Sequence, residues 1–513
     1  MAMGNITREE FRKLIDRRSQ PLLGLVNYLS RCKPGDNIIT RPLLGQLLSQ
    51  SMQMEELLDA YDAGNNRQWC VFRSLMAAFK SFSDVSYELL HIDHSRQAYR
   101  LLPIEENFEE ATKKALEFTE NVILRIAAQA ISTAQQAGLT LPPYIDCHRI
   151  YKEELPSGRL TRDCTAIDRE TVSGSVTLIS TAFLNLSAES EHICAAGRTK
   201  PQEYDTYLTN TVTEEKLRGL ELRFHNMQSL YDTYVSGTDV EKKDENLSVL
   251  RGHISVVFHL LRTATALAHY YERHLLKGVC AIQSVMEPFV AKEELLEILM
   301  KYSLHFINQY VGCAHRLCQE MLKRYSVVEE IEVPVPVYRG FHVRPSTLIS
   351  KLVLHYGCKV KMEIHGESYD ASSSLDLFRA NEKINAEKRR WLAQQILEDD
   401  LVPYQANPSE ISEGIRSIVL TLAEQGKLIL YEQPLEVPKT IGRGEGTLLE
   451  KVNDGIAQLL ALGKIDIATD IKARFIGDKR VLEDIKLLAD NGYGEDNFGN
   501  NITLPHRLEY LRR

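Results

Sequence analysis

Over roughly the first 330 residues, apolar side chains recur every three or four positions, the spacing that places them on one face of a helix. The clearest segment is 217–234, and after the polar loop 236–246 the same spacing resumes from Leu247 to Leu275. Two such helices joined by a polar loop predict an antiparallel helical hairpin over 212–276. Its first half uses Leu217, Leu220, Phe224, Met227, Tyr231 and Tyr234.

Breaks in this pattern divide the helical region. Runs such as "CKPGDN" and "AGLTLPPY" are typical of loops. We predict one helical domain at 1–145 and a second at 146–326 that contains the hairpin. Within the second, the segment "GSVTLISTAFLNLSAE" is compatible with strands or with a helix, and the pattern leaves both open.

The pattern changes after Tyr325. "VVEEIEVPVPVYRG" alternates and carries two prolines, which favours an edge strand or a linker that leads into one. Apolar positions at 348–356 predict a helix that starts near Pro345 and is capped by Gly357. A strand follows at 360–364, then the turn "HGES", a second strand, and a helix whose N-cap lies within "SSSLDLF".

Composition narrows the functional classes. There are 61 Lys and Arg against 70 Asp and Glu, a net charge of −9, so a nucleic-acid partner is not indicated. The nine cysteines form no CxxC pair, which favours reduced thiols over a zinc site or a disulfide framework. The N-terminus lacks an apolar signal region, and the most apolar long stretch contains Arg262 and three histidines. We therefore expect a cytoplasmic protein with no membrane span.

The stretch "YRGFHVRPSTL" at 338–348 carries the candidate chemistry. His342 lies just before a predicted helix N-terminus, where unpaired amides and the helix dipole favour an anion. An imidazole is a nucleophile near neutral pH, and Arg344 offers a fork of donors for phosphate oxygens. Ser346 and Thr347 are placed to join a phosphate-binding cradle. The pattern predicts phosphoryl acceptance on His342.

This stretch resembles the active-site motif of HPr, the histidine phosphocarrier of the bacterial sugar phosphotransferase system. Gly340, Phe341, His342, Val343, Arg344, Pro345 and Ser346 fit its pattern of Gly, apolar, His, any residue, Arg, Pro, and Ala or Ser. The resemblance implies an HPr-like open-faced β-sandwich over this part of the chain. Together with the all-α N-terminal region that the periodicity predicts, this makes the expected fold class α+β.

The resemblance also implies roles for single residues. His342 would receive phosphate from the phosphohistidine of an enzyme I-like donor protein, and Arg344 would stabilise the phosphate. The regulatory serine of the family falls at Ser373 or Ser374. Neither a cofactor nor a metal is expected. We expect Arg344 to be exposed and to contribute little to stability.

The chain departs from the family after this helix. We place an HPr-like domain at 331–465, an insertion at 379–426, and a C-terminal helical extension at 466–513. The last strand of the sheet is then expected at 427–432 and the closing helix at 447–462. The insertion would control access to His342, and its candidate interface residues are Arg389, Arg390 and Trp391, unless Trp391 is a core residue.

The leading interpretation is a phosphocarrier or regulatory protein rather than a turnover enzyme, with the helical region binding or sensing a regulatory target that the sequence does not identify. One alternative is an interaction scaffold that is never phosphorylated. Another is a phosphorelay bundle with His259 as acceptor, because His259 lies outside the hairpin seam and "HLLR" weakly resembles the core of histidine phosphotransfer bundles. Metal binding by His269 and His274, or by Cys313, His315 and Cys318, is disfavoured by their spacing on helices.

Overall fold

The computed structural model describes residues 6–36, 38–156, 160, 171–275, 289–399, 411–432, 434–438, 447–468 and 470–512. The chain divides into two compact units, Met1–Met321 and Leu322–Arg513. In the described residues, the secondary structure is predominantly helical, with six short strands. The predicted α+β class is therefore wrong: the chain is not a helical region followed by a β-sandwich. Much of the segment predicted as an insertion and of the residues after it also folds as helices.

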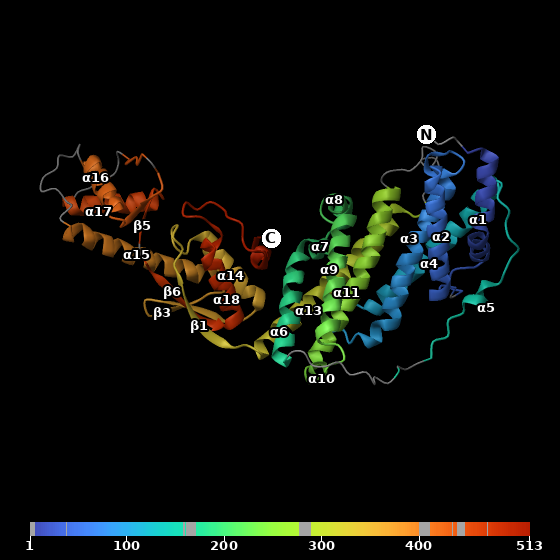
Figure 1. Ribbon diagram of the computed structural model, residues 1–513, viewed down its shortest axis with the longest axis horizontal. Helices are drawn as coiled ribbons and strands as arrows, with labels where there is room; N and C mark the ends of the chain where they lie inside the picture. The colour runs from blue at the N-terminus through green and yellow to red at the C-terminus, as the bar shows by residue number, and fades with distance from the viewer. Residues whose placement is uncertain are drawn as a thin grey trace. The chain divides into compact units, whose positions relative to one another are not determined.

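The first unit is built from long helices (Figure 1). Its N-terminal part consists of α1 (Arg8–Leu29), α2 (Arg41–Ala60), α3 (Cys70–Ser95), α4 (Phe108–Gln136) and the short α5 (Cys147–Tyr151). The undecided segment "GSVTLISTAFLNLSAE" lies in α6 (Val172–Glu189), so it is helical. Short helices α7 (Glu191–Ala196) and α8 (Tyr204–Asn210) follow.

The predicted hairpin is confirmed. It consists of α9 (Glu214–Tyr234) and α11 (Glu245–Tyr270), which pack together, with α10 (Asp239–Lys243) in the connection. The seam positions Leu217, Leu220, Phe224, Met227 and Tyr231 are buried. Besides α9, the helix α11 also packs against α3, so the hairpin and the N-terminal helices belong to one unit. The unit ends with α12 (Lys292–Glu297) and α13 (His305–Arg324), which continues to the start of the second unit.

The second unit contains a four-stranded antiparallel sheet. Its strands β1 (Val328–Pro334), β2 (Val360–Ile364), β3 (Glu367–Asp370) and β6 (Lys472–Asp478) have the spatial order β1-β6-β2-β3. β1 is an edge strand, one of the two alternatives that Pro334 and Pro336 favour. Apolar side chains of β2 and β6 are buried beneath α14 (Val343–Tyr356) and α18 (Lys479–Asp490), whereas Arg474 pairs with glutamates on the opposite, exposed face.

Two expectations about this sheet are wrong. Its last strand is β6 rather than 427–432, and residues 466–513, expected as a helical extension, supply that central strand and the helix that covers it. The segment 427–432 does contain a strand, β4 (Leu428–Leu430), but this strand pairs with β5 (Ile465–Ile467) in a separate two-stranded sheet. A short apolar run predicts that a segment is a strand. It does not predict which other strand that segment pairs with.

The inserted residues form a second hydrophobic core. The helix α15 (Ser374–Glu398) begins beside β3. Two further helices, α16 (Ile411–Glu424) and α17 (Leu448–Ala461), follow along the chain. With β4 and β5 these helices bury Leu392, Ile396, Ile411, Ile415, Ile418, Val419, Leu422, Leu428, Leu435, Val452, Ile456, Leu459, Ile465 and Ile467. We call this cluster the insertion core. The second unit therefore has two cores bridged by α15 (Figure 1).

Candidate functional site

His342 lies where the sequence placed it, at the start of a helix. It is the N-cap residue of α14, with an extended backbone (φ −74°, ψ −168°), and its side chain makes no capping hydrogen bond. The imidazole is therefore not used to close the helix end. The first-turn amides of a helix have no partner within that helix, and Pro345 in this turn has no amide hydrogen to leave unpaired.

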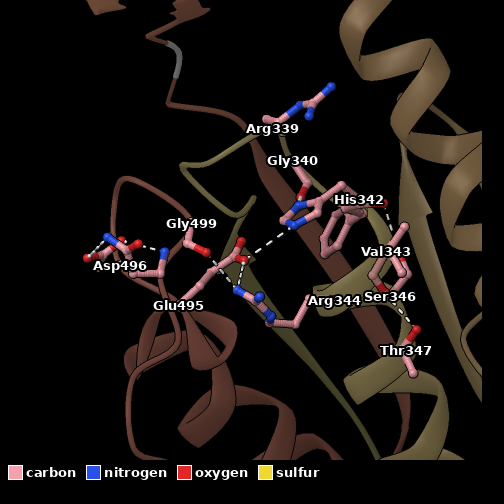
Figure 2. A network of polar contacts seen from close by, with 12 residues as sticks. Arg339, Gly340, His342, Val343, Arg344, Ser346, Thr347, Glu495, Asp496 and Gly499 are labelled. Atoms are coloured by element: carbon pink, nitrogen blue, oxygen red, sulfur yellow. Dashed lines mark hydrogen bonds and ion pairs between the residues drawn. The ribbon is translucent and has the colours of Figure 1, made fainter. Parts of the chain in front are cut away.

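Two acceptors contact the imidazole ring. Nδ1 lies 3.2 Å from the carbonyl oxygen of Gly340, and Nε2 lies 3.3 Å from Oε2 of Glu495 (Figure 2). The ring of Tyr338 meets the imidazole edge-on with centroids 5.4 Å apart. The side chain of His342 is 23% exposed. A neutral imidazole has one N–H, so it donates to one of these two acceptors at a time.

Glu495 links the histidine to the arginine. Its side chain is 2% exposed, and its Oε2 also lies 2.9 Å from Nη1 of Arg344. The same Nη1 lies 2.9 Å from the carbonyl oxygen of Gly499. Arg344, which we expected to be exposed and without a structural role, is 35% exposed and already paired with a buried carboxylate. Sequence reasoning missed Glu495, because nothing local to it indicates a partner so far away along the chain.

A tight loop holds Glu495 and Gly499 in place. Oδ1 of Asp496 accepts the amide hydrogens of Phe498 and Asn500, and the Asn500 side chain donates to Oδ2 of Asp496. Gly499 has φ +80°, and a Cβ there would lie 2.5 Å from Cε1 of Tyr338, so only glycine fits. The loop is thus built to present its carbonyl group to Arg344 (Figure 2).

The hydroxyl groups of Ser346 and Thr347 point elsewhere. Oγ of Ser346, which is buried, donates to the carbonyl oxygen of Phe341 at 2.7 Å, and Oγ1 of Thr347 donates to that of Val343 at 2.6 Å. Both hydroxyls therefore stabilise the start of α14. The structure brings together His342 and Arg344 but does not turn these two hydroxyls toward the ring.

The two regulatory candidates differ in position. Ser373 is the N-cap of α15, where its Oγ accepts the amide hydrogen of Asp376 at 3.2 Å. Ser374 is the first residue of the helix. The capping role predicted for this serine cluster is confirmed, and it belongs to Ser373.

The turn before His342 is held by residues after α14. Arg339 and Gly340 both have positive φ, at +56° and +62°. Oδ1 of Asn381 accepts the amide hydrogen of Phe341 at 2.9 Å, and its Nδ2 donates to the carbonyl oxygen of Arg339 at 3.1 Å. A Cβ on Gly340 would lie 2.2 Å from Oδ1 of Asn381. Asp466 also accepts the amide hydrogen of Arg339.

Only one of these two supporting residues belongs to the predicted insertion. Asn381 lies on α15 at the start of the segment 379–426, whereas Asp466 belongs to the segment predicted as a C-terminal extension. Asp466 lies on β5 and pairs with the buried Lys388 of α15 at 3.4 Å. Residues that follow α14 far along the chain therefore support the turn that carries His342. Nothing in the local sequence indicates this support, because an Asn and an Asp at these positions resemble ordinary polar residues.

A cleft opens beside His342. It has a volume of about 530 Å³ and lies between the start of α14, the helices α15 and α17, and β5. Arg339 and Arg389 contribute cationic groups, and Val343 and Phe378 contribute apolar surface. On α15, Trp391 is 37% exposed, and its neighbours Arg389 and Arg390 are also exposed. The alternative in which Trp391 is a core residue is therefore wrong.

The second candidate histidine has a different setting. His259 on α11 is 14% exposed, and its Nδ1 lies 2.6 Å from Oε2 of the buried Glu88 of α3. Its ring lies over that of His91, with centroids 4.0 Å apart. It is therefore held inside a network rather than displayed on the hairpin surface.

Two of the histidines considered as metal ligands have other polar partners. His269 pairs with Glu214, and Nδ1 of His315 contacts the hydroxyl of Ser187. Across the part of the chain that the structure describes, no set of three or more His, Cys, Asp or Glu residues is grouped as metal ligands. In that same part, every helix falls short of the length and apolar character that crossing a bilayer requires.

Comparison with known proteins identifies no relative of this chain. The chain matches no protein-family model, no curated protein and no solved structure.

Proposed function

We propose that this protein is a cytoplasmic phosphocarrier or regulatory protein of the phosphotransferase type, which accepts a phosphoryl group on His342 from an enzyme I-like donor. The observation that carries the proposal is the position of His342 at the start of α14, with Arg344 beside it and Glu495 contacting both. A helix start favours an anion, and guanidinium is the side chain best suited to phosphate oxygens. The HPr-like motif supports the same chemistry.

Nδ1 of His342 is the proposed nucleophile. Glu495 lies on the Nε2 side of the ring and can accept the hydrogen of Nε2–H, which leaves the lone pair on Nδ1. In this tautomer Nδ1 has no hydrogen to donate to the Gly340 carbonyl oxygen, so its lone pair is available for attack. The new bond joins Nδ1 to phosphorus, while the bond from phosphorus to the donor's histidine nitrogen breaks, and its electron pair returns to the donor. Glu495 then stabilises the Nε2–H of the phosphorylated ring.

Access to this nitrogen is proposed to depend on the insertion. Asn381 fixes the 339–341 turn, Arg389 lines the cleft beside His342, and the exposed Trp391 lies two residues further along α15. A donor protein that reaches His342 must meet this surface. Arg and Trp are frequent anchors of protein interfaces, so we propose that the insertion selects the donor and that the helical unit binds or senses a further partner.

The rival function is an interaction scaffold that is never phosphorylated. The observation that favours it is the ion pair between Arg344 and Glu495, because the guanidinium proposed to meet phosphate already has an anionic partner. The phosphorelay alternative, with His259 as acceptor, is weakened by the burial of that ring against Glu88.

The test is incubation of the full chain with enzyme I and phosphoenolpyruvate, followed by intact-mass measurement and acid treatment. We expect one acid-labile phosphoryl group that is absent from His342→Ala and present in His259→Ala. A matched control is His365→Asn, which changes an exposed histidine of the same unit at a residue with positive φ that asparagine tolerates. Label that persists in His342→Ala would overturn the assignment, and no label on the folded wild-type protein would favour the scaffold.

A further inference from the structure

A large cavity lies in the helical unit, far along the sequence from His342. It has a volume of about 1060 Å³, at the upper end of the range for small-molecule sites. Its walls come from the end of α3, the 96–100 segment, α9, α10 and α11. His259, the histidine that the proposed function leaves without a role, lies in this wall.

Five aromatic rings form a continuous row along the cavity. His91 and His259 lie with centroids 4.0 Å apart, His259 and Phe258 lie 5.1 Å apart, and Phe258 and His225 lie 5.5 Å apart. At the other end of the row, the ring centroids of His91 and Tyr99 lie 6.4 Å apart, and Nε2 of His91 lies 2.8 Å from the Tyr99 hydroxyl. Such a row offers flat faces on which a planar ring can stack.

A buried carboxylate holds the His259 ring in place. Glu88 contacts both Nδ1 of His259 and Nη1 of Arg262, at 2.6 and 2.7 Å. Burial, together with the neighbouring His259, lowers the pKa of His91 to about 4, so its ring is neutral at physiological pH. The His259 ring at the centre of the row is thus held by Glu88, and His91 beside it is uncharged.

Beside the row of rings, the backbone of α11 packs closely against the 96–100 segment. A Cβ on Gly252 would lie 1.6 Å from the carbonyl oxygen of Tyr99, so α11 packs directly against the backbone of the 96–100 segment. Arg100, the next residue, has φ +48°, an unusual conformation for an arginine. This packing sets the guanidinium of Arg100 at the edge of the cavity.

The charged groups of the cavity include both signs. Asp232 forms two hydrogen bonds with Arg251, and Glu241 accepts from the Tyr231 hydroxyl and the Gly237 amide. Glu245 lies in the first turn of α11, where a carboxylate is favoured. Arg100 has only the Ser248 hydroxyl, at 3.4 Å, as a hydrogen-bond partner among the described residues. An incoming anion therefore meets Arg100 without displacing a carboxylate, and Arg251 lies further along the same wall.

We propose that this cavity binds a small organic anion with a planar ring, such as a nucleoside phosphate, with the ring stacked on the row and the anionic group on Arg100. Both features are needed for this assignment, since rings alone would accept any apolar molecule and arginines alone would accept inorganic phosphate. The site would make the helical unit a ligand sensor, and binding there does not require His342 to be phosphorylated.

The test is calorimetric titration of the full chain with adenosine 5′-monophosphate, and separately with adenine and with inorganic phosphate. We expect saturable binding of the nucleotide at least tenfold tighter than that of either half, because two kinds of contact act together. No saturable binding of the nucleotide, or equal binding of phosphate alone, would overturn the proposal.

Two variants test the contacts with little risk to folding. Arg100→Asn removes the charge at a residue whose positive φ suits asparagine, and His225→Ala removes an exposed ring at the end of the row. Each should weaken nucleotide binding by about tenfold, the size expected for one charge-assisted or stacking contact. The matched control is Arg125→Gln, an exposed arginine on α4 outside the cavity wall, which should bind as the wild type does. Unchanged binding in both test variants would place the nucleotide elsewhere and overturn the site.

Discussion

Nη1 of Arg344 lies 2.9 Å from Oε2 of Glu495, a residue 151 positions further along the chain. The carboxylate is buried and the guanidinium is partly exposed. Because the same oxygen atom contacts Nε2 of His342, a single buried anion holds both members of the motif. The resting site therefore already contains a negative charge close to where a phosphoryl group would be bound.

The first prediction concerns the stability of this pair. Replacing Arg344 by methionine should destabilise the second unit by about 1–3 kcal/mol, because it removes the main partner of a buried carboxylate while the arginine itself is partly solvated. Chemical denaturation of the single variants Arg344→Met and Glu495→Gln and of the double variant measures the coupling. A double variant as unstable as the sum of the two singles would show that the pair contributes nothing.

Glu495 should also affect phosphorylation. With glutamine at this position the acceptor for Nε2–H is uncharged and the ring is oriented less firmly, so we expect phosphoryl acceptance to slow by about tenfold, as for other positioned proton acceptors. The measurement is the initial rate of label incorporation from enzyme I. A faster rate would mean instead that Glu495 competes with phosphate for Arg344.

Asn381 should be needed for the shape of the 339–341 turn. Asn381→Ala leaves the buried amide of Phe341 and the carbonyl of Arg339 without their partner, which should cost about 1–3 kcal/mol and reduce phosphoryl acceptance. The control is Asn385→Ala, one turn later on α15 and also at the cleft. If both variants lose the same stability and activity, the turn does not depend on Asn381.

Ser373 and Ser374 can be separated by their effect on α15. Ser373→Ala should lower the stability of the second unit by about 1 kcal/mol through loss of the N-cap, whereas Ser374→Ala should change it little. Thermal unfolding of the two variants gives the comparison. An equal effect of the two substitutions would contradict the capping geometry.

The helical unit should lose stability in mild acid. Burial lowers the pKa of His253 to about 4, and its Nε2 accepts the amide hydrogen of Leu102 at 3.1 Å, a bond that protonation would break. In the unfolded chain a histidine takes up a proton near pH 6.5. Between these values the unfolded state binds more protons, so stability falls as the pH drops from about 6.5 to 4.

His91 and His274 act in the same direction, because burial lowers the pKa of His91 to about 4 and that of His274 to about 3. For His253 alone the difference corresponds to about 3 kcal/mol. Denaturation midpoints measured from pH 7 to pH 4 test this, and His253→Gln, which still offers an acceptor to Leu102, should flatten the curve. A wild-type midpoint that does not change with pH would contradict the prediction.

The local pattern of the chain determined much of the secondary structure. The heptad spacing at 217–234 and from Leu247 onward specified the hairpin of α9 and α11, because a continuous apolar stripe needs a partner helix. Likewise, Gly357 adopts the left-handed conformation that ends α14, and the alternation at 360–364 forms β2. His342 and Arg344 were found because the motif is contiguous.

Only the tertiary structure decided which segments meet. β4 and β6 are both short extended segments, and their sequences do not say that β6 enters the sheet while β4 pairs with β5. Glu495 and Asn381 approach His342 or its turn from distant positions, and a single sequence carries no record of such pairing. Periodicity reports whether one face of an element is buried. It does not report what covers that face, because hydrophobic burial is non-directional and the final choice depends on packing and on satisfying buried polar groups.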